Sequence, residues 1–92
     1  MIPKSIVIIG KTHIVKSKGH TYHSCIILFD GKQVANVEKT FGWENWFLYS
    51  AFRKLDELKL VPDYKNSPSE WCELNNVTLF HTSFEVSKSK DL

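Results

Sequence analysis

The chain has 92 residues, of which 42% are apolar and 24% charged, and its net charge is +2 at pH 7. This length suffices for a single domain, and this composition excludes a disordered chain. Dedicated nucleic-acid-binding domains are usually more basic. The charge is uneven, because residues 1–61 carry nine Lys and Arg against five Asp and Glu, whereas residues 62–92 carry three against five. The first part of the chain is therefore the one expected to attract an acidic partner.

Three strands are predicted in the first half of the chain. Residues 5–17 are rich in β-branched side chains, residues 21–29 are apolar on both faces, and residues 33–41 return after Asp30-Gly31. An Asp-Gly pair between two such segments is a strong signal for a two-residue hairpin. The middle strand is expected to be central, because both of its faces carry apolar side chains.

Helical periodicity follows over residues 43–60, and Pro62 is expected to end that helix. Its predicted apolar stripe consists of Phe47, Leu48, Ala51, Phe52, Leu55 and Leu58. Ser67-Pro68-Ser69-Glu70 predicts the start of a short helix that runs to about Leu74, with Ser67 as N-cap. Asn75 and Asn76 then turn the chain into a final strand over residues 77–86.

The predicted layout is therefore β-β-β-α-α-β within one α+β domain over residues 1–92, with a frayed tail at 87–92. We expect an antiparallel sheet of three hairpin-linked strands plus a C-terminal strand, one long helix packed on the sheet and one short helix. Two placements of the last strand stay open, namely the edge of this sheet and pairing with a second copy in a homodimer.

The cysteine and histidine side chains are the candidate metal ligands and catalytic groups of the chain. His20 and His23 are three apart in an extended segment and so point to opposite faces, which leaves only His23 and Cys25 on one face. We predict no catalytic site, no metal and no cofactor, and a small enzyme or metal protein that uses His23 and Cys25 stays a further alternative. Cys25 and Cys72 are predicted to be buried thiols in a reducing, cytoplasmic environment, although a single disulfide stays an alternative. The first residues show neither a signal peptide nor a membrane span, so we expect no membrane association.

Two groups of residues are predicted to form binding surfaces. Residues 41–47 contain four aromatic side chains, and Trp43 or Trp46 is expected to be exposed as a binding anchor. The alternative is that both pack beneath the following loop. The cations are the second group: Lys11, Lys16, Lys18 and His20 near the first hairpin turn, Lys32 at the other end of the sheet, and Lys39. They either bind phosphates or form a solvated edge that discourages strand pairing.

The layout of Gly19-His20, the strand at 21–29, Asp30-Gly31-Lys32, a third strand and a helix containing Ala51 resembles part of the double-stranded-RNA-binding domain. In that family the loop between the first two strands reaches the minor groove of the RNA. The resemblance implies direct nucleic-acid binding. The lysine cluster with which the family begins its last helix is replaced here by Trp43-Glu44-Asn45-Trp46.

A second resemblance rests on Thr21-Tyr22-His23-Ser24, on Asp30-Gly31-Lys32 and on the Phe41-Gly42-Trp43 break. These motifs are similar to those of small proteins encoded by bacteriophages and mobile elements. The resemblance implies a non-catalytic protein that binds stoichiometrically to a host protein or nucleoprotein complex, for example as an anti-CRISPR inhibitor of defence. Direct nucleic-acid binding through the basic hairpin and the sheet edge is the alternative.

Overall fold

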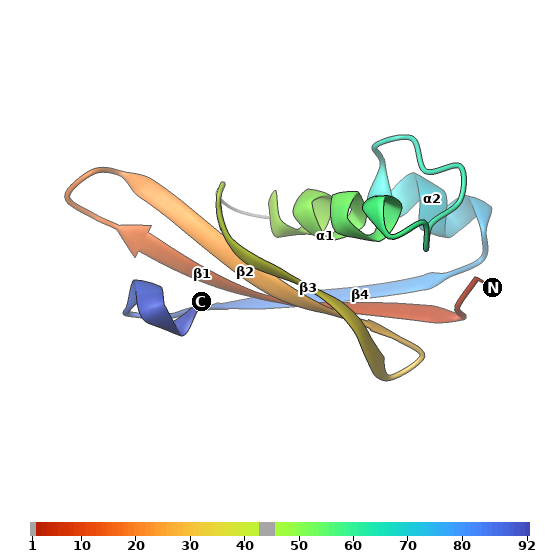
Figure 1. Ribbon diagram of the computed structural model, residues 1–92, viewed down its shortest axis with the longest axis horizontal. Helices are drawn as coiled ribbons and strands as arrows, with labels where there is room; N and C mark the ends of the chain where they lie inside the picture. Colours follow the sequence, from red (N-terminus) through yellow and green to blue (C-terminus); the bar gives the residue numbers. More distant parts are fainter. Residues whose placement is uncertain (1, 43–45) are drawn as a thin grey trace.

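The computed structural model describes residues 2–42 and 46–92, which form a four-stranded sheet with two helices on one face (Figure 1). In chain order the elements are β1 (Ser5–Val15), β2 (His20–Phe29), β3 (Lys32–Phe41), α1 (Trp46–Glu57), α2 (Pro68–Leu74), β4 (Thr78–Glu85) and the short 3₁₀ helix η1 (Ser89–Asp91). The predicted α+β class is confirmed. Within the part of the chain that the structure describes, no helix has the length and apolar character needed to cross a lipid bilayer.

The sheet is mixed, so the prediction of an antiparallel sheet is wrong for its last strand. The strand order is β3-β2-β1-β4, with β1, β2 and β3 antiparallel neighbours and β4 parallel to β1. Two helices separate β3 from β4, and a connection of this length is long enough to carry the chain across the sheet to pair in parallel with β1. The last strand thus occupies an edge of its own sheet, and β2 is central as predicted.

The turn between β2 and β3 is the predicted two-residue hairpin. Asp30 has φ +49° and Gly31 has φ +85°, the paired positive values that a type I′ turn requires. The Asp30 carboxylate also accepts hydrogen bonds from the backbone N–H groups of Lys4 and Ser5, each at 3.0 Å. The turn therefore also fixes the start of β1.

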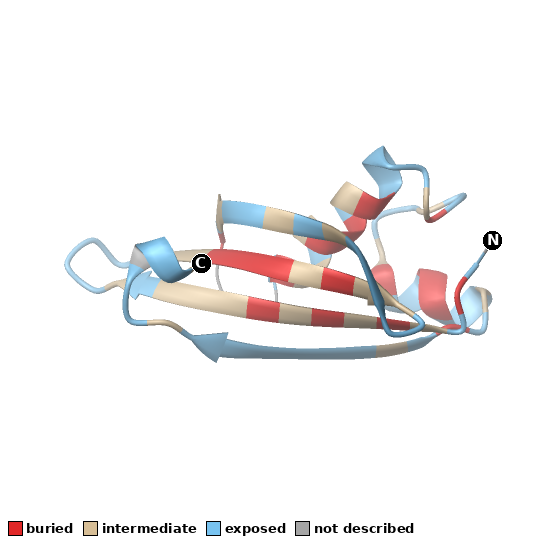
Figure 2. Ribbon diagram, turned by 60° about the horizontal axis from the view of Figure 1, so that its bottom comes forward, coloured by how far each residue is buried: buried red, intermediate tan, exposed pale blue. Residues whose placement is uncertain are grey.

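The core lies between the helices and the sheet face formed by alternate residues of β1 and β2 (Figure 2). Its buried members are Ile6, Ile8, Cys25, Ile27, Phe47, Ala51, Phe52, Leu55, Val61, Trp71, Cys72 and Val77. Phe47 packs directly over Gly10, where a Cβ atom would lie only 2.9 Å from the ring. Glycine at this position allows α1 to approach the sheet closely.

Helix α1 ends earlier than the periodicity predicts, at Glu57 rather than residue 60. Lys59 has φ +59°, the Lys59 N–H donates to the Asp56 carbonyl, and the Leu60 N–H donates to the Leu55 carbonyl. These bonds form a Schellman motif, which satisfies the last carbonyl groups of the helix before Pro62 is reached. Because the helix has already ended, Leu58 leaves the apolar stripe and is exposed, contrary to prediction.

Helix α2 begins and ends as predicted. The Ser67 side chain accepts a hydrogen bond from the Glu70 N–H at 3.4 Å, and Pro68 occupies the first helical position. Asn76 has φ +56°, and the Val77 N–H donates to the Cys72 carbonyl, which closes a second Schellman motif. The turn at residues 75–76 therefore leads directly into β4.

The C-terminal segment, expected to be frayed, contains the single turn η1. Two hydrogen bonds attach the segment before it to β1: the Val86 N–H donates to the Thr12 carbonyl at 2.7 Å, and the His13 Nδ1 lies 3.0 Å from the Val86 carbonyl. These bonds extend the β1–β4 pairing by one residue.

Candidate functional site

Three aromatic rings gather on the sheet face opposite the helices, close to the β1–β2 turn. The β2–β3 register places Tyr22 opposite Phe41, and His20 lies two residues before Tyr22 on the same face. The ring centroids are 5.7 Å apart for Tyr22 and Phe41, 5.5 Å for His20 and Phe41, and 6.4 Å for His20 and Tyr22, all edge to face. Edge-to-face contact is a favourable arrangement for a pair of aromatic rings. Phe41 remains half exposed to solvent.

Cationic groups border these rings. The Lys39 ammonium lies 4.8 Å above the Tyr22 ring centroid, within the range of a cation–π interaction. Lys16 and Lys18 are exposed in the turn that leads to His20, and that turn is closed by a hydrogen bond from the Lys18 N–H to the Val15 carbonyl.

We call the set formed by Lys16, Lys18, His20, Tyr22, Lys39 and Phe41 the hairpin-end surface. It combines apolar ring edges with positive charge, which suits either a protein surface or a nucleic acid.

A second pair of exposed rings lies at the start of α1. The Trp46 and Tyr49 centroids are 5.6 Å apart, and each side chain is about half exposed. Gly42 has φ +148°, and a Cβ atom there would lie 2.6 Å from the Trp46 ring. Glycine therefore permits both this backbone conformation and the close packing of the Trp46 ring on Gly42.

Not all of the predicted site residues meet at this surface. Lys32 lies at the far end of β2 and β3, next to the Asp30-Gly31 turn. The Lys11 ammonium donates a hydrogen bond to the Asp91 carbonyl at 3.2 Å, so its side chain contacts the C-terminal segment. Trp43 lies outside the described residues.

Two members of the hairpin-end surface were not selected from the sequence, namely Tyr22 and Phe41. Only the register between β2 and β3 places them opposite each other. The alternation in residues 21–29 had already placed Tyr22 on the face away from Cys25, and the aromatic content of residues 41–47 had marked Phe41. Together these signals could have identified the pair, had the register been known.

His23 is the most deeply buried polar side chain near the site, and it connects the sheet to α1. Its Nδ1 lies 3.1 Å from the Gly42 carbonyl, and its Nε2 lies 2.8 Å from the Ser50 hydroxyl. A carbonyl only accepts, so in the neutral form of the ring the proton lies on Nδ1, and Nε2 then accepts from the Ser50 hydroxyl. With both nitrogens satisfied, the imidazole fixes the start of α1 against β2.

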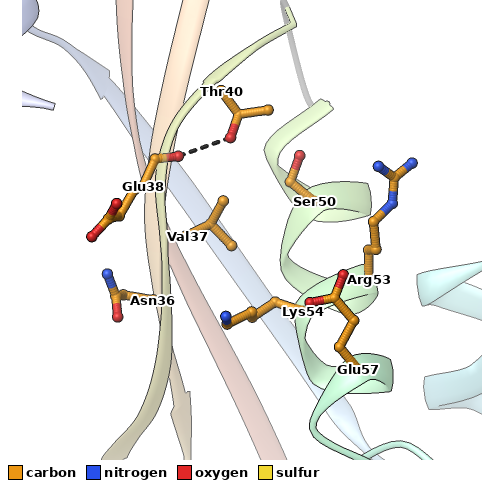
Figure 3. A pocket seen from close by; sticks show the side chains of 8 residues that line it. All are labelled: Asn36, Val37, Glu38, Thr40, Ser50, Arg53, Lys54 and Glu57. Atoms are coloured by element: carbon orange, nitrogen blue, oxygen red, sulfur yellow. Dashed lines mark hydrogen bonds between the residues drawn. The ribbon is translucent and has the colours of Figure 1, made fainter.

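Ser50 borders a groove of about 310 Å³ between β3 and α1 (Figure 3). In Figure 3, Val37 and Lys54 point into the space between the strand and the helix, whereas Glu38 points to the opposite side of the strand. Arg53, Lys54 and Glu57 also line the groove, which is therefore mixed in charge.

The two cysteines are free and buried. Burial raises the pKa of both the Cys25 and the Cys72 thiol to about 11 from a usual value of 9.0. Nucleophilic attack requires the thiolate, which is scarce at neutral pH when the pKa is this high. Among residues 2–42 and 46–92, no three His, Cys, Asp or Glu side chains gather in a way that could hold a metal ion.

Comparison with family models, with curated proteins and with solved structures finds no match.

Proposed function

We propose that this chain is a small non-catalytic binding protein that acts stoichiometrically on a protein or nucleoprotein partner. The observation that carries the proposal is the hairpin-end surface, where three aromatic rings lie edge to face and the Lys39 ammonium lies above one of them. Lys16 and Lys18 are exposed in the turn that leads to His20. Rigid aromatic side chains contribute strongly to binding energy, because they bury a large area and lose little conformational entropy.

The buried thiols support a non-catalytic role. Cys25 lies beneath α1 with its Sγ 3.8 Å from the Phe47 carbonyl, so neither its position nor its raised pKa suits a nucleophile. The Ser50 hydroxyl is held by the buried His23 ring and contributes to the packing of α1.

The partner is expected to present acidic groups around an apolar patch, complementary to lysines around aromatic rings. The likeness to phage-encoded proteins suggests a host nucleoprotein complex, such as one that serves in defence. Inhibition by occupying a surface of such a complex requires binding alone.

The test is capture of the partner by immobilised protein from a lysate of the cells in which the chain acts. Phe41→Ala and the double variant Lys16→Glu/Lys18→Glu should each remove a species that the wild-type chain retains in near-equimolar amount. Lys65→Glu is the matched charge control, because Lys65 is exposed in the loop before α2, in a different part of the fold. Equal capture by all variants would refute the assignment of the hairpin-end surface.

Direct nucleic-acid binding is the second candidate, and the Lys39–Tyr22 contact favours it. A lysine beside aromatic rings can neutralise a phosphate while a base stacks on an exposed ring. Gel-shift titrations with duplex RNA, duplex DNA and single strands at two salt concentrations distinguish this candidate. A shift that weakens steeply with salt and is lost in Lys16→Glu/Lys18→Glu supports it, and no shift at micromolar protein excludes it.

A further inference from the structure

The sheet face opposite the helices carries a strip of apolar side chains that no described element covers (Figures 1 and 2). The register places its members side by side across three strands: Val7 opposite Leu28, Ile9 opposite Ile26, and Phe80 beside Val7. Phe84 lies further along β4. We call these six residues the open-face strip.

The strip is apolar at its centre, and the register places a charged residue, Lys11, beside Phe84 at one end. Val7, Ile9, Ile26 and Leu28 are all partly exposed, and Phe80 and Phe84 are 61% and 50% exposed. The two phenylalanines alone therefore present roughly 220 Å² to solvent, taking about 200 Å² for a whole side chain. Monomeric proteins rarely leave larger contiguous apolar patches than a few hundred Å², and such patches mark interaction sites.

The chain exposes more area than a compact monomer of its mass does. The chain exposes 6272 Å², whereas a compact monomer of this mass exposes about 5,500 Å². The excess is of the same size as the roughly 800 Å² that each partner contributes to a standard interface. The protruding β1–β2 hairpin contributes to the excess together with the uncovered sheet face.

We propose that the open-face strip is the interface of a homodimer in which two copies of this sheet pack face to face. A two-fold axis through the strip brings aliphatic side chains against the same side chains of the second copy and buries no charge at the centre. Two sheets packed in this way form a sandwich about 10 Å thick between their mean planes. Each copy then has a core on both faces of its sheet.

A nucleic acid fits this strip less well than a second copy does. Bases bind where aromatic rings and cations lie together, as at the hairpin-end surface, whereas Lys11, which lies beside Phe84 at the end of the strip, donates a hydrogen bond to the Asp91 carbonyl. The centre of the open-face strip contains only branched aliphatic side chains, which favour packing against another apolar face. The two surfaces therefore serve different contacts, and the dimer would carry two hairpin-end surfaces.

Analytical ultracentrifugation of the purified full chain, alone in buffer and over a range of concentrations, tests whether the dimer forms. The wild type should sediment at twice the 10.7 kDa of one chain at micromolar concentration. Ile26→Lys should weaken dimerisation at least tenfold, because it places two like charges at the two-fold axis. Leu74→Lys is the matched control, since Leu74 is 75% exposed on α2 at the helical side, and it should remain dimeric.

Phe80→Ser is the second variant in case Ile26→Lys fails to fold, since β4 is an edge strand and Phe80 is largely exposed. A wild-type monomer at the highest concentration would overturn the proposal. A dimer that tolerates both strip variants would also overturn it, and would indicate pairing through the β4 edge. A monomer whose strip variants lose binding to a single-stranded oligonucleotide would assign the strip to nucleic acid instead. Lys16→Glu/Lys18→Glu should leave the dimer unchanged, which separates this test from that of the proposed function.

Discussion

Substituting alanine for Gly10 tests whether the close approach of α1 to the sheet depends on the missing side chain. The new Cβ would lie 2.9 Å from Cγ and Cδ2 of Phe47 and 3.1 Å from its Cδ1. Ordinary contacts begin near 3.4 Å. Phe47 is completely buried, so its ring cannot move aside without displacing the neighbouring core residues.

Two effects of opposite sign determine how much Gly10→Ala changes the free energy of unfolding. Overpacking a dense core costs about 1–3 kcal/mol. Alanine also restricts the unfolded chain, which stabilises the fold by about 0.4–1 kcal/mol where the backbone conformation suits it. Gly10 has no positive φ, so this second effect applies. The net loss should be about 1–2 kcal/mol, and each kcal/mol lowers Tm by about 4–8 °C in a domain of this size.

Urea unfolding at fixed protein concentration, followed by circular dichroism, measures the loss. The mechanism is isolated by the double variant Gly10→Ala/Phe47→Leu, in which the smaller side chain makes room for the new methyl group. Its free energy of unfolding should be no lower than that of Phe47→Leu alone. Strict additivity of the two single changes, or an unchanged stability in Gly10→Ala, would refute the reasoning.

Three further predictions concern buried polar groups. Ser50→Ala leaves the Nε2 of His23 without its partner and should lower the free energy of unfolding by about 1–3 kcal/mol, whereas Ser69→Ala, at an exposed position of α2, should change it little in the same urea titration. Because burial raises the pKa of Cys25 and Cys72 to about 11, the unfolded chain releases these thiol protons at lower pH than the folded chain does. The free energy of unfolding should therefore fall between about pH 9 and pH 11, and less steeply in Cys72→Ala; an equally steep fall in that variant would contradict the assignment. Neither thiol should react rapidly with a disulfide reagent at pH 8 in the folded chain, and both should react in urea.

Features encoded by neighbouring residues were predictable from the sequence. The Asp30-Gly31 turn and the Ser67-Pro68 helix start each depend on side chains and backbone angles within four residues. The two faces of β2 follow from alternation alone, and the structure places Cys25 in the core as predicted. Exposure of Trp46 was one of two alternatives, and the structure selects it.

Features that residue preferences do not encode, or that depend on distant residues, were not predictable in this way. Helix α1 ends at Glu57 because Lys59 adopts a left-handed conformation, which lysine has no intrinsic tendency to favour. The Tyr22–Phe41 contact depends on a register that contains two irregularities between β2 and β3. The proximity of Lys39 to Tyr22 follows from that register.

The sequence by itself determined an α+β chain with three hairpin-linked strands, because alternation and turn residues are local properties. Only the tertiary structure decided that β4 lies parallel to β1 at the sheet edge. The same alternating pattern is compatible with a parallel or an antiparallel strand and with either edge of the sheet. It also decided which apolar face stays open. Phe80 and Phe84 lie on one face of the last strand, and both helices pack on the opposite face of the sheet, so their burial would require a second molecule.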